Sequence, residues 1–290
     1  EIHRYKTQDA HSQELLDVRR KELQGARAFL NTFDMYSGAD IVSMLKELNG
    51  ETFQAAASIT DMIVDSISTT GKVPLGYDRN DSWAVATVRR TLGTEIETLL
   101  QRDRTANEHI TLVQIALQAG LNHISEYVLD LWTVPSKGLN KTIGKVFAGI
   151  QMQQSHVISR TWRSLTKEQT KRAAYQAPEL SDYITDIVKA LLVVAGWWPR
   201  TKSEREAQIE STVRGRISPI VSLLEKLDGA MSKITSMDLV FDIPPAGTSF
   251  DARIMEDTNN GESSSNGVVL LTSGIGLKNV DIDVRDERPE

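Results

Sequence analysis

The five histidines of this chain are its best candidates for holding a metal ion or transferring a proton near neutral pH. They are His3, His11, His109, His123 and His156. No two of them stand four residues apart, as two ligands on one helical face would, and the HExxH zinc motif is absent. His109 and His123 are separated by about four helical turns, which is too far for one ion. We therefore expect packing or surface roles for the histidines, and no metal site.

Other catalytic signatures are also missing. The chain has no cysteine, which excludes thiol catalysis, disulfides and cysteine-ligated metals. It has no GxSxG elbow and no P-loop, and Gly274-Ile275-Gly276 is only a fragment of a dinucleotide-binding loop. Asp61 and Asp65 lie one turn apart and could bind Mg²⁺ with a diphosphate, as in terpene cyclases, but the aspartate-rich cluster and second metal motif of that class are absent. We expect no catalytic residue and no cofactor; an enzyme with an inter-helix pocket that carries no local motif stays an alternative.

Basic side chains gather around one tryptophan and could form a phosphate- or RNA-binding surface. The cluster comprises Arg160, Arg163, Lys167, Lys171 and Arg172, with Trp162 and Tyr175 nearby. No array of aromatic residues accompanies it, so an ordinary solvated helix face is the simpler interpretation. The formal net charge of -6 and the pI of about 5.5 also argue against a dedicated nucleic-acid-binding protein. We expect no nucleic-acid partner.

Two adjacent tryptophans, Trp197 and Trp198, follow a long apolar run. Because adjacent residues on a helix point about 100° apart, both are hard to bury on one stripe, so one of them could lie at a domain or subunit contact. They could also lie at a membrane interface, with Arg200 and Lys202 contacting lipid headgroups. The simpler alternative is that the two rings close the end of a helical bundle.

The elements that position these side chains are predicted to be helices, because apolar residues recur every three or four positions over most of the chain. Capping boxes at Ser37-Gly38-Ala39-Asp40 and Ser203-Glu204-Arg205-Glu206 predict the starts of two long helices. The segment 108–132 is apolar on nearly every side, which is typical of a central helix. Glu97 is expected to face water from the helix that carries it. Further helices are predicted near 82–102, 139–165, 167–175 and 178–198.

Residues 1–35 are predicted to form a long coiled-coil-like helix. Their apolar residues make a narrow seam with a heptad repeat, interrupted once by Arg19. The seam consists of Leu16, Leu23, Ala26, Leu30 and Phe33. Since the rest of this helix is polar, it needs a partner along one stripe. We expect that partner to be a second copy of the chain, so the protein is predicted to be a homo-oligomer, most simply a homodimer.

The hydrophobic rhythm changes after residue 235, and the chain is predicted to have three parts: the helix 1–35, a helical bundle over 36–235 and a tail over 236–290. β-like runs in the tail lie at 237–243, 268–272 and 280–284, with a polar loop at 256–266. The tail is too short for a core of its own, so it must pack on the bundle or stay partly loose. The expected fold class is mainly α, a multi-helix bundle with a small β-containing C-terminal tail.

Three segments carry a resemblance to known proteins: Ala39–Asp61 (ADIVSMLKELNGETFQAAASITD), Leu112–Gly120 (LVQIALQAG) and Ile158–Thr166 (ISRTWRSLT). In this order, after a polar seam helix, they resemble an uncharacterised family of helical proteins abundant in mushroom-forming basidiomycete fungi. The resemblance covers most of the chain from Glu14 to Glu256. Its motifs are packing motifs, so it implies a helical fold and a fungal source and transfers no active site.

A second resemblance lies in the tail. Pro244–Glu256 (PPAGTSFDARIME) looks like the segment that leads into the β-domain of GrpE-type nucleotide exchange factors. Those proteins also place a long N-terminal helix before a bundle and a small β-module, and the resemblance implies cochaperone function. The departures are large, because the helical middle is far too long here and Ala252 replaces the usual proline after Phe-Asp.

Taken together, the sequence favours a non-enzymatic interaction or scaffold protein that self-associates. A bundle that binds a membrane interface through the Trp197–Trp198 region is the first alternative, and an enzyme or ligand-binding protein with an unmarked pocket is the second. No apolar run reaches the roughly 18–20 residues needed to span a bilayer. We expect a cytoplasmic protein.

Overall fold

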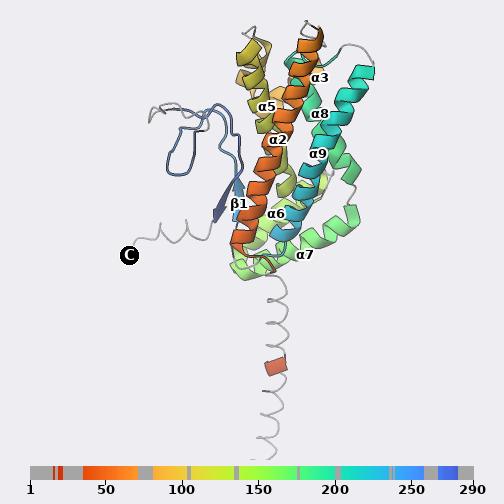
Figure 1. Ribbon diagram of the computed structural model, residues 1–290. Coiled ribbons are helices and arrows are strands. Elements are labelled where there is room, and N and C mark those ends of the chain that lie inside the picture. Colours follow the sequence, from red (N-terminus) through yellow and green to blue (C-terminus); the bar gives the residue numbers. More distant parts are fainter. Residues whose placement is uncertain are drawn as a thin grey trace, which may run out of the picture.

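Helices make up most of the chain in its computed structural model (Figure 1). The structure describes residues 16, 19–21, 35–70, 81–102, 106–133, 137–174, 177–199, 204–234, 237, 239–257 and 267–279. The elements within these ranges are α2 (Gly38–Thr70), α3 (Ser82–Leu92), α4 (Thr94–Gln101), α5 (Ala106–Asp130), α6 (Lys137–Gln153), α7 (His156–Ala174), α8 (Ala177–Val194), α9 (Glu204–Met231), β1 (Leu239–Asp242) and β2 (Gly276–Asn279). The predicted fold class, mainly α with a small β-containing tail, is confirmed.

The long helix α2 begins where the sequence predicts. The backbone N–H of Ser37 donates to Asp40 Oδ2 at 2.8 Å, and the backbone N–H of Asp40 donates to Ser37 Oγ at 3.2 Å. This reciprocal pair is a capping box, which satisfies donors that a helix start would otherwise leave without partners. Asp81 caps α3 in a related way, since its Oδ1 accepts from the backbone N–H groups of Trp83 and Ala84.

The core lies between α2, α5, α8 and α9, which run side by side (Figure 1). α5 packs against α2, α3, α4, α8 and α9, so the prediction that the nearly all-apolar segment is central is confirmed. Its residues Leu117 and Leu121 are buried, as are Leu191 of α8 and Ile217 of α9. Each such side chain contributes about 1.5–3 kcal/mol relative to leaving it in water.

The single helix predicted near 82–102 is divided at Gly93. This glycine has φ 91° and ends α3, where its N–H donates to Arg89 O. A left-handed φ is easy only for glycine, so the residue ends one helix and begins the next. The bend also corrects the prediction for Glu97, which is 6% exposed and accepts two hydrogen bonds from Arg89, at 2.8 and 3.1 Å.

The helix predicted over 139–165 is likewise two helices, α6 and α7, separated at Gln154 and Ser155. The helix predicted near 167–175 is the continuation of α7 and not a separate element. The two helices form a hairpin, and α7 lies across the lower end of the bundle in Figure 1. We refer to Lys137–Ala174 as the α6–α7 hairpin.

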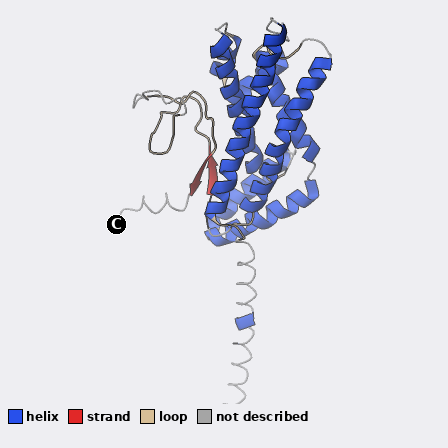
Figure 2. Ribbon diagram, viewed as in Figure 1, coloured by secondary structure: helices blue, strands red, loops and turns tan. Residues whose placement is uncertain are grey.

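The tail contributes a two-stranded antiparallel sheet, β1 with β2, in which Leu239 pairs with Asn279 and Phe241 with Leu277 (Figure 2). The strand predicted at 268–272 is wrong, because Val268 makes only an isolated bridge with Ser249. The run 280–284 and most of the loop 256–266 lie outside the described residues.

The tail packs on the bundle, one of the two outcomes expected. The side-chain amide of Asn49 in α2 both donates to Ile275 O and accepts from Ile275 N, each at 3.0 Å. Gln118 in α5 donates to Ser273 O at 2.7 Å. These bonds hold an extended segment against α2 and α5 through its backbone, and Ile275 is itself buried.

Candidate functional site

Helix α7 is docked with its polar face inward. Ser159, Arg160, Ser164 and Lys167 are all buried, and their spacing places them on one side of the helix. Two apolar residues of the same helix, Ile158 and Leu165, lie on the opposite side and are 52% and 38% exposed; Val157, in the first turn, is 47% exposed. An amphipathic helix of a globular protein normally has the reverse arrangement. The apolar side of α7 is therefore presented outward.

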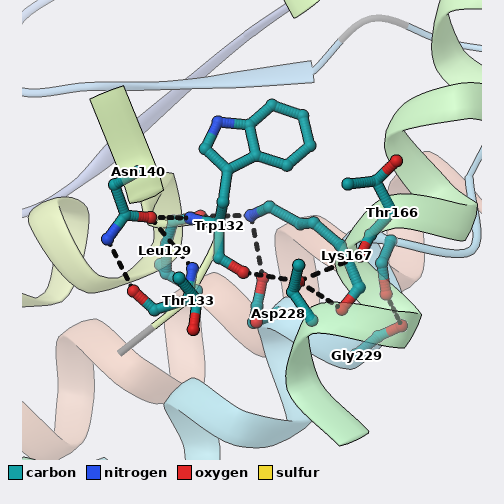
Figure 3. Close-up of polar contacts among 10 residues, drawn as sticks. Leu129, Trp132, Thr133, Asn140, Thr166, Lys167, Asp228 and Gly229 are labelled. Carbon is teal, nitrogen blue, oxygen red and sulfur yellow. Dashed lines mark hydrogen bonds and ion pairs between the residues drawn. The ribbon is translucent and has the colours of Figure 1, made fainter. Parts of the chain in front are cut away.

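Lys167 is the residue that holds this polar face against the bundle (Figure 3). Its Nζ donates to Leu129 O at 2.7 Å and to Asp228 Oδ1 at 3.1 Å. Leu129 lies in the last turn of α5 and Asp228 in the last turn of α9, so one ammonium group joins three helices. A cation near the carboxyl end of a helix also interacts favourably with the helix dipole.

The residues after α5 are tied down by two further side chains (Figure 3). Asn140 of α6 accepts from the backbone N–H groups of Trp132 and Thr133 at 2.7 and 2.9 Å, and donates to Thr133 O at 2.6 Å. Thr170 of α7 has its hydroxyl 2.6 Å from Trp132 O. The backbone groups exposed by the end of α5 thus find partners on both helices of the hairpin.

An aromatic cluster completes the junction. The rings of Trp132, Phe147 and Trp162 lie 5.2 to 5.9 Å apart; Phe147 and Trp162 are stacked with an interplanar angle of 12°. Phe147 belongs to α6 and Trp162 to α7, so this stack fixes how the two helices of the hairpin face each other. Aromatic pairs of this kind contribute about 0.5–1.5 kcal/mol each beyond their buried area.

The chemistry available to this cluster is structural. The Nζ of Lys167 is engaged with a carboxylate and a carbonyl oxygen of two other helices, so this side chain links helices to one another. Burial of Arg160 and Lys167 also corrects both sequence interpretations of the basic cluster, since these two side chains belong neither to a phosphate-binding surface nor to a solvated face.

The exposed apolar side chains of the hairpin form one surface. On α6, Leu139 and Val146 are one heptad apart and are 46% and 48% exposed; on α7, Ile158 and Leu165 are also one heptad apart. Leu139 and Val146 share one side of α6, and Ile158 and Leu165 share the side of α7 that lies opposite its buried polar residues. We call Leu139, Val146, Ile158 and Leu165 the outer face.

The two adjacent tryptophans are both buried, at 3% and 0% exposure. Trp197 has its ring centroid 5.4 Å from that of His109, whose Nε2 is 3.1 Å from Ala195 O. Neither ring is therefore exposed on the surface, and their burial favours the interpretation in which both close the end of the bundle. Arg200 and Lys202 lie outside the described residues.

Trp198 is held by charged neighbours. Its Nε1–H donates to Glu206 Oε1 at 3.2 Å, and the Nζ of Lys189 lies 4.8 Å above its ring and 3.3 Å from the same Glu206 oxygen. Glu206, the glutamate of the capping box predicted at the start of the last helix, therefore also accepts the hydrogen bond of the buried indole N–H of Trp198. With this partner the indole N–H needs no hydrogen bond from water or from a lipid headgroup.

The remaining predicted residues are not brought together. Leu16 is helical and 68% exposed, whereas Leu23, Ala26, Leu30 and Phe33 lie outside the described residues. Asp61 and Asp65 are both exposed on α2. Within the described ranges, no three His, Asp or Glu residues are grouped closely enough to hold a metal ion. Within those ranges, too, no helix combines the length and apolarity that crossing a membrane requires.

Comparison with family models, with curated proteins and with solved structures finds no match to this chain.

Sequence reasoning missed the outer face. It predicted a helix over 139–165 but did not predict which of its apolar side chains, such as Val146 and Ile158, would stay exposed. The available signal was the polar side of α7, where serine, arginine and lysine recur at helical spacing and need buried partners elsewhere in the chain.

Proposed function

We propose that the protein is a non-enzymatic interaction protein that self-associates through the N-terminal seam. The observation that carries this proposal is the 68% exposure of Leu16, which has helical backbone geometry. A leucine at a heptad position is stabilised only when a partner covers it, by about 1.5–3 kcal/mol when burial is complete. A second copy of the chain supplies an identical stripe.

The buried charged side chains support the non-enzymatic part of the proposal. Lys167 is bonded to Asp228 and to a backbone carbonyl, and Glu97 is bonded to Arg89. These groups join one helix to another. An acid or base in catalysis needs instead to reach a substrate proton within hydrogen-bond distance.

The experiment is a mass measurement by light scattering on the full chain. Leu23→Glu with Leu30→Glu places two charges on the seam, and the expected result is a change from twice the chain mass of 32.2 kDa to the monomer mass. Gln24→Glu with Asn31→Glu makes the same change in charge one position outside the seam and should leave the dimer intact. An unchanged mass in the seam variant, or a monomeric wild type, refutes self-association through this segment.

The cytoplasmic location expected from the sequence is retained in the proposal. Cell fractionation tests it, with recovery in the secreted fraction as the contrary result.

A further inference from the structure

The outer face of the α6–α7 hairpin is apolar surface that the bundle leaves uncovered. Its four residues are between 38% and 52% exposed, and Met152, near the turn between the helices, is 88% exposed. Isolated apolar side chains on a surface are ordinary, but several on the outward sides of two neighbouring helices indicate a binding surface. The proposed self-association uses another part of the chain, so this face needs a different partner.

The charge of the hairpin indicates what kind of partner this is. Among residues 137–174 there are eight Lys or Arg and one acidic residue, in a chain with a net charge of -6. The basic residues are Lys137, Lys141, Lys145, Arg160, Arg163, Lys167, Lys171 and Arg172, and the acidic one is Glu168. Arg160 and Lys167 are buried, whereas Lys141 and Lys145 are exposed on α6. The hairpin is thus a basic, apolar-faced element on an acidic protein.

A second copy of the same face is a poor partner, because it would bring two basic hairpins together. The seam of residues 16–33 is also poor, since it carries Arg19, Arg20, Lys21 and Arg27 against Asp17 and Glu22. Charge complementarity requires an anionic partner. A helix with apolar residues on one side and exposed lysines turned away from them is the pattern of an element that lies at the boundary between lipid headgroups and acyl chains, and the neighbouring tryptophan suits the same boundary.

We propose that the α6–α7 hairpin docks on the surface of a membrane that contains anionic lipid. Leu139, Val146, Ile158 and Leu165 enter the boundary between headgroups and acyl chains, to a depth of about 5–10 Å. Lys141 and Lys145 supply attraction to the negative surface. Lys167 keeps α7 turned with its apolar side outward, through its bonds to Leu129 and Asp228.

The test is flotation of the full-length protein with vesicles of phosphatidylcholine, with and without phosphatidylserine. The expected result is flotation with the anionic vesicles, weakened by high salt because salt screens surface charges. Lys141→Gln with Lys145→Gln should weaken binding about 25-fold, at about fivefold for each lysine. Lys46→Gln with Lys233→Gln removes the same charge from two exposed positions outside the hairpin and should change binding little.

A second pair of variants tests the apolar part. Val146→Glu with Ile158→Glu should weaken binding by more than about tenfold. The matched control is Val42→Glu with Ile254→Glu, which makes the same changes at exposed positions elsewhere and should bind as the wild type does. Circular dichroism checks that each variant is folded.

Several outcomes would overturn the inference. They are equal flotation of the hairpin variants and their controls, absence of flotation with anionic vesicles at low salt, and equal binding to vesicles with and without phosphatidylserine. A change in the lipid-free mass of Val146→Glu with Ile158→Glu would assign the face to contact between copies of the chain. None of these outcomes depends on whether the seam variant is monomeric.

Discussion

Replacement of Lys167 by methionine removes a charge that joins three helices. Methionine keeps an unbranched stem of similar length, so most of the packing of the lysine stem is retained. The substitution leaves the Asp228 carboxylate without its ion pair and Leu129 O without this donor. The two charged side chains are only 10% and 16% exposed, so water compensates little of the loss.

The magnitude follows from this burial. Breaking a buried ion pair by removing one partner costs about 3–5 kcal/mol. We take the lower end, about 3 kcal/mol, because the pair retains some exposure. For a chain of this size, each kcal/mol lowers the melting temperature by about 2–4 °C, so the variant should melt about 6–12 °C below the wild type.

Urea unfolding and thermal unfolding followed by circular dichroism measure the effect. Adding Asp228→Leu removes the uncompensated carboxylate and should restore about 2 kcal/mol, leaving the cost of the lost donor to Leu129 O, about 1 kcal/mol. The control is Lys226→Met, because Lys226 lies 3.8 Å from Glu47 and both are more than half exposed; its expected cost is about 0–1 kcal/mol. Equal losses from Lys167→Met and Lys226→Met would refute the assigned role of the buried pair.

Three further predictions concern other parts of the fold. Gly93→Ala should destabilise the protein by about 1–2 kcal/mol in urea unfolding, because its φ of 91° disfavours a side chain although space is available; Gly50→Ala, inside α2 and equally unobstructed, should stabilise it by about 0.5–1 kcal/mol. Asn49→Ala should speed hydrogen exchange of the Ile275 amide by about tenfold or more, while amides in the core of α5 keep their protection. Burial, with two neighbouring carboxylates, raises the pKa of Glu126, so the folded state disfavours its charged form and loses stability as pH rises above the ordinary value of 4.5. Glu126→Gln should therefore raise the melting temperature at pH 7 by more than it does at pH 4; an equal gain at both would contradict the burial argument.

The sequence predicts where most helices lie, because caps and apolar spacing are local properties. The Ser37–Asp40 capping box and the central position of α5 are both readable from residues close together in the chain. The division at Gly93 was missed because the apolar stripe continues across it. Periodicity reports which residues share a face, whereas a break depends on a single backbone angle.

The outer face could not be predicted for a related reason. Helical spacing predicts which side of its helix Val146 lies on, and that Ile158 and Leu165 share one side of theirs. Whether another segment of the chain covers that side depends on the rest of the fold. Here the partners of the opposite side of α7 are Leu129 and Asp228, which lie 38 and 61 residues from Lys167. For the same reason the sequence predicted strands at 268–272 and 280–284, whereas β2 lies between them at Gly276–Asn279. The position of a strand depends on the partner with which it pairs as well as on its own residues.

The bond between Asn49 and Ile275 has a consequence for how the protein is made. The two residues are 226 positions apart. At a synthesis rate of about 5–20 residues per second, the amide of Asn49 emerges about 11–45 s before the backbone that it will hold. Helices form and pair within far less than that interval. Newly made chains therefore pass through a stage in which the bundle is assembled and the tail is not yet attached to Asn49, and a chain that terminates before residue 267 never makes this attachment.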